Sequence, residues 1–423
     1  MAKWFALDNA AKIYPPAATR KWSAMFRLSV NLTEDVDPAV LEEANARALE
    51  RFPSFACRLR RGLFWYYLEH MDSAPPLQED VYNPLTKLNE KANRHFMYRL
   101  LYYKNRIACE FCHALTDGTG GMTFLLSTVA EYLRIKYGDD VVESDYILSC
   151  GEEPDPEEYG DSFLKYASKE TISRREGSSY NMSGSAVPLN KMLFVSAKVP
   201  TDALLKKAKE HGVTVGVFLS SLLLYSAYKN QQTEKRKRKR NKDIKVSVPL
   251  DLRRFFPSRT LRNFSAYINP SISPRLGEYT FEEILVQVKH SMGLFLNEKE
   301  LRGRFSANVA AEKNVFIRIM PLFVKFIVLK MFYIFQGDKY YATTISNLGV
   351  VRLPEGMERR VERIDFMPGR ALIPRSNCSV VSYKGSTYIN FTRTILESDI
   401  EKCFLTELVK MGVPVFVEGN ERY

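Results

Sequence analysis

A polar segment near the middle of the chain separates two series of apolar patterns, and this division restricts the possible folds. Residues 150–190 contain the acidic, proline-bearing stretch GEEPDPEEYGD and the small, polar stretch REGSSYNMSGSAVP. Single hydrophobic cores stop growing at about 250–300 residues, whereas the chain has 423. We therefore expect two halves, residues 1–170 and 190–423, with residues 150–190 as the linker region between them.

Both halves mix strand and helix patterns. The first half contains an alternating strand at 24–32, a helix at about 38–51, and a β-hairpin over 96–113 that turns at Lys104 and Asn105. The second half continues with strands at 192–200 and 244–253, a helix near 280–297, further strands, and a final helix at about 397–411. Hairpins outnumber strand–helix–strand units, so we predict an α/β fold in which each half is a mixed or antiparallel sheet with helices.

Composition restricts the compartment and the partners. Six cysteines are too few for a disulfide framework, and MAKWFALDNAAKIYPPAATRKW at the N-terminus lacks the apolar centre of a signal peptide. We therefore expect a reducing, cytoplasmic setting. The net charge of +12 favours anionic partners, and six of the positive charges form the run Lys235–Arg240. This run is a solvated loop, a contact for CoA phosphates or an acidic carrier protein, or a nucleic-acid contact; because no recognisable nucleic-acid module accompanies it, we expect no nucleic-acid partner.

Residues 315–335, VFIRIMPLFVKFIVLKMFYIF, form the one segment that resembles membrane material. Arg318, Pro321, Lys325 and Lys330 interrupt it, and charges are costly inside a bilayer. The pattern favours a buried helix of the fold. An interfacial membrane helix is the second interpretation and a membrane span the third.

The stretch ACEFCHALTDGTGG, residues 108–121, contains two overlapping motifs. The first is C-x-x-C-H at Cys109, Cys112 and His113, the box that attaches a c-type haem. Positions an odd number apart in a strand face opposite ways, so the two sulfurs would diverge in the predicted strand. A zinc site would lack a second pair of ligands nearby. We therefore expect two packed cysteines here and no metal.

The second motif is H-x-x-x-D-G, formed by His113, Asp117 and Gly118. His113 ends a predicted strand, a glycine-rich turn follows, and a helix begins at once. A residue at a strand end can project into a cleft, while the helix N-terminus behind it supplies backbone donors and a positive dipole. A neutral imidazole at this position is a candidate general base. The alternative is a core histidine before a glycine turn.

H-x-x-x-D-G at the end of a strand resembles the hallmark of the CoA-dependent acyltransferase superfamily, which includes chloramphenicol acetyltransferase, peptide-synthetase condensation domains, plant acyltransferases and alcohol or wax-ester acyltransferases. Three further stretches resemble it in the expected order: FRLSVNL with LEEANARALERFPSFACRL, KVSVPLDLRRFF with NFSAYINP, and ISNLG at 345–349. The matches cover about residues 5–395. The plant D-F-G-W-G motif is absent and Cys112 replaces the doubled histidine of condensation domains, so the resemblance favours the alcohol acetyltransferase branch.

The resemblance implies a two-domain fold of the chloramphenicol acetyltransferase type, with His113 in a channel between the halves. It implies that His113 removes a proton from an alcohol or amine, which attacks an acyl-CoA thioester directly, with acyl-CoA as co-substrate and no permanently bound cofactor. Cys112 as an acyl-carrying nucleophile is the rival, but it points away as a strand neighbour of His113. The alternatives for the whole protein are condensation from a carrier-protein thioester and a non-catalytic relative that contacts a membrane peripherally through residues 315–335.

The resemblance also assigns supporting residues. It implies that Asp117 turns away from His113 and pairs with an arginine, for which Arg253 in VPLDLR is the matching position and Arg254 the fallback; simple turn capping by Asp117 is the alternative. Gly118 is expected to permit a sharp turn without a Cβ. Ser346 and Asn347, expected in a glycine-bearing loop after a strand, are candidate donors to substrate or oxyanion, or they satisfy only the local backbone.

Overall fold

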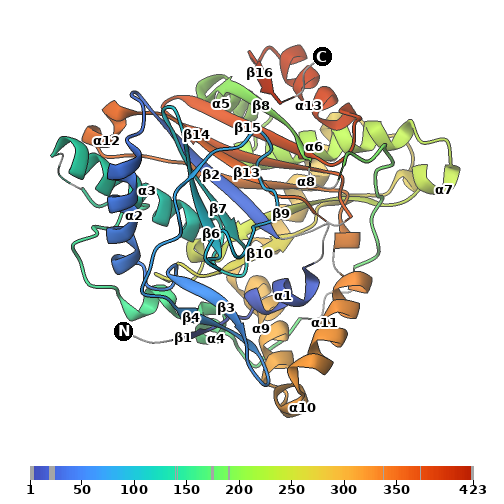
Figure 1. Ribbon diagram of the computed structural model, residues 1–423. Coiled ribbons are helices and arrows are strands. Elements are labelled where there is room, and N and C mark those ends of the chain that lie inside the picture. The colour runs from blue at the N-terminus through green and yellow to red at the C-terminus, as the bar shows by residue number, and fades with distance from the viewer. Residues whose placement is uncertain are drawn as a thin grey trace.

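Two large sheets form the centre of the molecule in the computed structural model (Figure 1). The structure describes residues 4–18, 24–138, 140, 142–172, 176–188, 191–336, 338–371 and 373–420, without the side chains of 332–336 and 338. Parts of the predicted linker, residues 173–175 and 189–190, lie outside this description.

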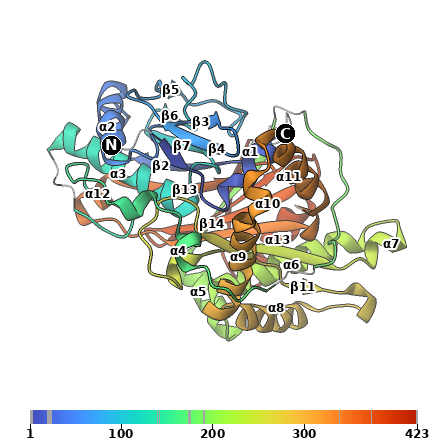
Figure 2. The same ribbon diagram turned by 90° about the horizontal axis from the view of Figure 1, so that it is seen from below.

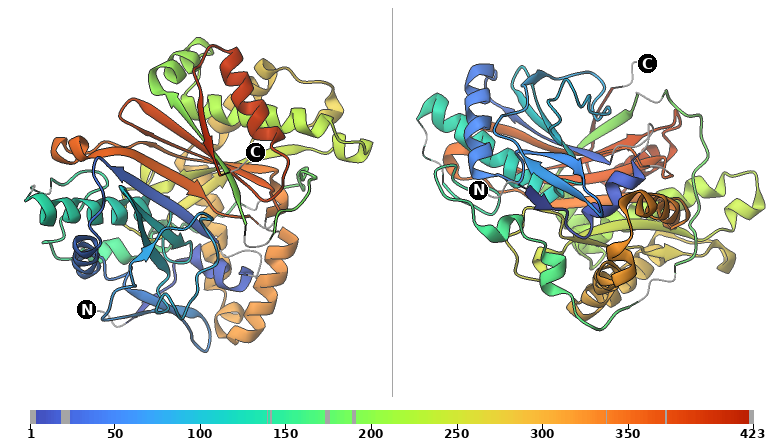
Figure 3. Two further views of the ribbon diagram at one scale, coloured as in Figure 1. Left: turned by 45° about the horizontal axis from the view of Figure 1, so that its top comes forward. Right: turned by 60° about the horizontal axis from the view of Figure 1, so that its bottom comes forward.

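The first sheet has five strands in the order β13-β2-β7-β6-β5. They are β2 (Met25–Leu32), β5 (Gln78–Glu79), β6 (Tyr98–Tyr103), β7 (Arg106–Cys112) and β13 (Val361–Pro368). The helices α2 (Pro38–Arg51) and α3 (Gly118–Tyr137) pack side by side, and α3 contacts β2 and β7 (Figure 3). Helix α2 begins where the sequence predicts because the Asp37 carboxylate accepts hydrogen bonds from the backbone N–H groups of Ala39 and Val40.

The second sheet has eight strands, with β11 (Ser271–Ile272) beside β9 and the others in the order β10-β9-β12-β14-β15-β8-β16. These are β8 (Leu193–Pro200), β9 (Ile244–Asp251), β10 (Ser265–Ile268), β12 (Thr343–Val350), β14 (Ser376–Tyr383), β15 (Ser386–Arg393) and β16 (Phe416–Gly419). Helices α5 (Thr201–Glu210) and α6 (Val215–Gln232) contact this sheet, and α8 (Phe281–Phe295) and α13 (Asp399–Lys410) pack on α6. Each sheet has its own buried apolar core.

Strand β13 joins the two sheets. It pairs antiparallel with β2 of the first sheet, yet it comes from the second half of the chain and contacts β14 and β15 (Figure 2). The Asn390 side-chain amide of β15 donates a 2.8 Å hydrogen bond to the Phe366 carbonyl of β13. The first sheet is therefore completed by a strand that lies more than 200 residues away in the sequence.

A small third sheet and several helices lie at one end of the molecule. The sheet consists of β1 (Trp4–Ala6), β4 (Tyr66–His70) and β3 (Cys57–Arg61). The N-terminal segment continues with η1 (Ala11–Ile13) and α1 (Tyr14–Ala17), and α1 contacts α11 (Leu322–Gln336). Helices α9 (Glu298–Lys313) and α10 (Val315–Ile319) precede α11.

Three predicted elements differ from the structure. The segment 315–335 is two helices, because Pro321 has no N–H to continue the helix and the residue before a proline avoids the helical region. The run Lys235–Arg240 is not only a loop, since Lys237–Arg240 form the short helix α7. Residues 150–190 carry η2 (Pro156–Tyr159) and α4 (Ser162–Tyr166), and Tyr180 of this segment is buried in the core of the second sheet.

Among the described residues, no single helix combines the length and the apolar composition of a membrane span. Helices α5 and α6 have the required length and composition only when they are taken together, and this pair bends by 81°.

Candidate functional site

His113 follows directly on β7, at the point where the strand ends. Its backbone N–H donates a 2.8 Å hydrogen bond to the Ala24 carbonyl, which fixes the start of the turn. The imidazole stacks on Tyr14 with 5.4 Å between ring centroids, and Phe26 lies 4.6 Å from it on β2. The residue as a whole is half-buried, while Nδ1 of its ring is buried and has no hydrogen-bond partner among the described residues.

The aromatic surroundings decide the charge of His113. Burial lowers its pKa from the usual 6.5 to about 4, although the nearby Asp117 carboxylate favours the cation. The imidazole is therefore neutral at pH 7, which is the form that accepts a proton.

Asp117 does two things at once. It caps α3, because its Oδ1 accepts a hydrogen bond from the Gly120 N–H at 3.1 Å. Both carboxylate oxygens also accept from the Arg253 guanidinium, at 2.9 and 3.2 Å, and Oδ2 accepts from the Phe264 N–H at 2.8 Å. The two interpretations that the sequence left open, capping and ion pairing, are thus both present.

Every guanidinium nitrogen of Arg253 donates hydrogen bonds at this site. Its remaining N–H groups donate to the carbonyls of Thr260 and Arg262, at 2.9 and 2.7 Å, and to the Asp251 carboxylate at 2.9 Å. All five guanidinium hydrogens are therefore used. Arg254, the fallback, is exposed instead and lies near Gly349.

Asn263 supports His113 from behind, and the sequence motifs did not single it out. One amide hydrogen bonds to the His113 carbonyl at 2.9 Å and the other to the Asp8 carboxylate at 3.1 Å. Asp8 in turn accepts from the Ala11 N–H at 2.7 Å. Asp8 of the N-terminal segment therefore positions the Asn263 amide, and Asn263 in turn fixes the turn at His113. Asn263 stands in the stretch NFSAYINP that resembled the family, but nothing in its spacing pointed to this contact.

The glycines after Asp117 are not a turn before the helix, as the sequence suggested, because α3 begins at Gly118 itself. Their role is close packing. A Cβ on Gly118 would lie 2.9 Å from Cδ2 of Leu348, and one on Gly120 would lie 2.0 Å from the Leu261 carbonyl oxygen. Gly118 therefore does not serve a left-handed turn: its missing Cβ lets Leu348 of β12 lie against the start of α3.

Ser346 and Asn347 lie within β12 rather than in a loop after it. Ser346 pairs with Ser379 and Asn347 with Val380 on β14, and the register shifts only between Asn347 and Val350. Neighbouring side chains of a strand leave opposite faces, so these two do not converge on one substrate atom. Asn347 Oδ1 also accepts the Gly349 N–H at 2.8 Å, the local backbone bond that the sequence left as an alternative.

The cysteines of the C-x-x-C-H stretch are part of the packing. Cys109 is fully buried in the core of the first sheet, and Cys112 is partly buried against it. Burial raises the pKa of the Cys112 thiol, which keeps it protonated. Among the described residues no three His, Cys, Asp or Glu side chains gather as a metal site.

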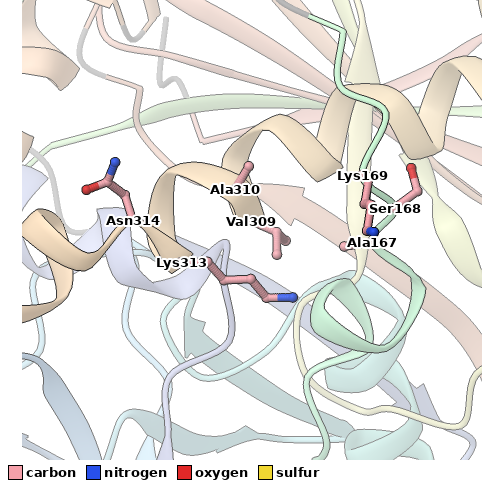
Figure 4. A pocket seen from close by; sticks show the side chains of 7 residues that line it. All are labelled: Ala167, Ser168, Lys169, Val309, Ala310, Lys313 and Asn314. Atoms are coloured by element: carbon pink, nitrogen blue, oxygen red, sulfur yellow. The ribbon is translucent and has the colours of Figure 1, made fainter.

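Two further surface features contain none of these residues. Helix α7 projects at the outer edge of the molecule (Figures 1 and 2), where Lys239 pairs with Glu234. A surface hollow lies between the end of α9 and the segment after α4 (Figure 4), lined by Ala167, Ser168, Lys169, Val309, Ala310, Lys313 and Asn314. None of these is a predicted site residue. The channel to His113 that the resemblance implies stays a prediction.

Solved structures match the chain over nearly its whole length, whereas no protein-family model and no curated protein matches it. TRI101 of F. graminearum, solved with coenzyme A and T-2 mycotoxin, aligns with a TM-score of 0.64 at 11% identity, over 99% of this chain and 100% of that one. Polyketide synthase associated protein 5 from Mycobacterium tuberculosis gives 0.63 at 15% identity, over 96% and 98%. The starter condensation domain of rhizomide synthetase, with C8-CoA, gives a TM-score of 0.59 at 13% identity, over 97% of this chain and 94% of that one.

These matches show the fold. The chain has the two-domain α/β architecture of acyltransferases and condensation domains, as the H-x-x-x-D-G motif and its companions predicted.

Proposed function

We propose that this protein transfers an acyl group from a CoA thioester to the hydroxyl or amine of a small molecule, with His113 as general base. The observation that carries the proposal is a neutral imidazole at the end of β7. Asn263 donates a hydrogen bond to the His113 carbonyl, and the nearby Asp117 carboxylate is paired with Arg253. A carboxylate held in this way shapes the histidine turn and does not take part in proton transfer. The imidazole is then the group that acts on the acceptor.

The proposed reaction is a direct displacement. His113 accepts the proton of the acceptor while the acceptor oxygen or nitrogen attacks the thioester carbonyl. The tetrahedral intermediate collapses as the carbon–sulfur bond breaks, and the imidazolium returns the proton to the departing CoA thiolate. No covalent acyl-enzyme is needed, in agreement with the protonated Cys112 thiol.

The oxyanion of the intermediate needs a hydrogen-bond donor. The Ser346 hydroxyl and the Asn347 amide on β12 are the candidates that the motif offers. Because their side chains leave opposite faces of the sheet, we assign this contact to one of them only. Leu348 of the same strand packs against Gly118, which supports a position of β12 beside the histidine turn.

The donor and the setting are also proposals. Matching structures that were solved with coenzyme A or C8-CoA support acyl-CoA as co-substrate here. The alcohol acceptor follows from the ISNLG resemblance. Six free cysteines support the cytoplasm as the compartment.

A thiol-release assay tests this function. Purified protein is incubated with acetyl-CoA and a panel of alcohols and amines, and free CoA is measured with a thiol reagent. We expect acceptor-dependent release that falls about 10²–10⁴-fold in His113→Gln. His290→Gln is the matched control, because His290 is exposed on α8, and it should keep the full rate.

Two outcomes would overturn the proposal. Equal rates in wild type and His113→Gln would remove the imidazole from the reaction. Turnover only with an acyl carrier protein in place of acetyl-CoA would favour condensation from a carrier-bound thioester.

A further inference from the structure

Apolar side chains from two distant parts of the chain are exposed at the same end of the molecule. Leu63 at the tip of the β3–β4 hairpin is 73% exposed, Phe316 of α10 is 78% exposed and Phe323 of α11 is 71% exposed. The other exposed apolar residues of these segments are Phe64, Val315, Ile319, Ile327, Val328 and Met331. Figure 1 shows α10, α11 and the β3–β4 hairpin together at this end. We call these nine residues the apolar tip.

The hairpin and the helices are fixed to each other. The Leu322 N–H donates to the Leu63 carbonyl at 2.9 Å. The Lys325 ammonium donates to the carbonyls of Phe64 and Arg318, at 3.0 and 3.1 Å, and lies 3.8 Å from the Trp65 ring centroid. Lys325 is buried, so its ammonium group interacts with these two carbonyls and the Trp65 ring rather than with solvent. These contacts therefore hold the hairpin and the helices of the apolar tip in one defined arrangement.

The helices present one apolar side outward. Phe323, Ile327 and Met331 are spaced four residues apart, which places them in one row along α11. On the opposite side Leu322 is buried in the core of the first sheet, and Phe326 packs against that core. Helix α11 is therefore apolar on its outward side as well as on the side that faces the core. A water-facing helix would carry polar residues in the exposed row.

Positive charges outnumber negative charges around the apolar tip. From residue 313 to residue 336 the sequence contains no Asp or Glu, while Arg318 in this stretch is exposed. Arg61, beside the hairpin tip, is exposed as well, whereas the neighbouring Arg60 pairs with Glu69 at 2.8 Å. Exposed aromatic and aliphatic side chains beside the exposed Arg61 and Arg318 match the interface of an anionic lipid bilayer, where apolar groups enter the acyl region and cations contact phosphate.

We propose that the apolar tip docks the protein on an anionic membrane surface. It lies on the bilayer and does not cross it, because α11 has 15 residues and begins after the Pro321 break, whereas a span needs about 20. Phe316 and Phe323 enter the boundary between headgroups and acyl chains, and Arg61 and Arg318 contact the lipid phosphates.

The apolar tip lies close to the histidine turn. Helix α11 contacts α1, and Tyr14 of α1 stacks on the His113 ring. Lys12 of the same segment lies 5.3 Å above the Trp65 ring of the hairpin. If the proposed function holds, docking therefore brings the bilayer near the site, and apolar alcohols dissolved in the membrane become available as acceptors.

Vesicle sedimentation tests the docking without any acyl donor, so its failure is separate from a failure of the enzymatic proposal. The full chain is spun with phosphatidylcholine vesicles that contain 0 or 30% phosphatidylserine, a composition chosen to vary surface charge alone. We expect binding to the anionic vesicles that weakens with added salt. Phe316→Asp with Phe323→Asp should reduce the bound fraction at least about tenfold, and Arg61→Gln with Arg318→Gln about fivefold or more.

Leu276→Asp is the matched control, because Leu276 is 83% exposed but lies before α8, outside the apolar tip. It should bind like wild type, and circular dichroism should show that every variant is folded. Equal sedimentation of wild type and the double aspartate variant would overturn the proposal. So would a concentration-dependent dimer that the aspartates dissociate, since a second copy of the chain would then cover the surface.

Discussion

The buried pair of Asp117 and Arg253 illustrates how one ion pair fixes the site. Each partner has several hydrogen bonds besides the pair itself, so neither charge is left unsatisfied in the low-dielectric interior. Arg253 belongs to the segment after β9 and Asp117 to the start of α3, so the pair ties the two halves together beside His113.

Removing the arginine should therefore be expensive. We predict that Arg253→Gln lowers the free energy of unfolding by about 3–5 kcal/mol, because the Asp117 carboxylate remains buried without its cation. Urea titration followed by tryptophan fluorescence measures this. Lys410→Gln, which breaks the exposed pair with Glu407, is the control and should unfold at the wild-type urea concentration. A wild-type midpoint for Arg253→Gln would mean that the pair does not hold the fold together.

At the scale of the element, the start of α3 is set by close packing. Gly120 approaches the Leu261 carbonyl so closely that no side chain fits, and Gly121 lies against the Phe26 ring. Glycine is a poor helix former, at a cost of about 1 kcal/mol relative to alanine. Packing of the turn against the second half therefore outweighs helix propensity here.

Alanine substitutions separate the two effects. Gly120→Ala should destabilise the protein by about 2 kcal/mol or more and reduce acyl transfer, because its Cβ would lie 2.0 Å from the Leu261 carbonyl oxygen and push α3 away. Gly293→Ala in α8 has open space around its Cβ and should raise stability by about 0.5–1 kcal/mol. Thermal unfolding of both variants gives the comparison. A stabilised Gly120→Ala would show that the contact does not constrain the helix start.

Elements with a clear period were predictable from sequence, and elements set by tertiary contacts were not. The α2 helix and the β6–β7 hairpin appear where cap, period and turn residues indicate them. No pattern in the sequence analysis predicts helix α9, and Pro321 is expected there only to interrupt one segment. The first turn of α3 was predicted as a turn, because three glycines read locally as a turn and their packing partners are distant in the sequence.

At the scale of the whole molecule, the site is assembled from segments that no local pattern connects. His113 and Asp117 were found through one motif, and Arg253 through its position in a second. Asn263, Asp8 and Tyr14 come from two other regions and meet only in the folded chain. The completion of the first sheet by β13 is of the same kind, since no periodicity reveals which sheet a strand joins. The candidate site residues that belong to a sequence motif are therefore predictable from the sequence. The contacts that support them become visible only in the folded structure.

The pH dependence of kcat/KM for acyl transfer tests the neutral general base most directly. Because burial lowers the pKa of His113 to about 4, the imidazole is neutral above that pH and protonated below it. We predict that kcat/KM stays level from pH 7 down to about 5 and then falls with an apparent pKa about 4. The residual activity of His113→Gln should lack this limb. An acid limb at the ordinary histidine value of about 6.5, or the same limb in His113→Gln, would contradict the account.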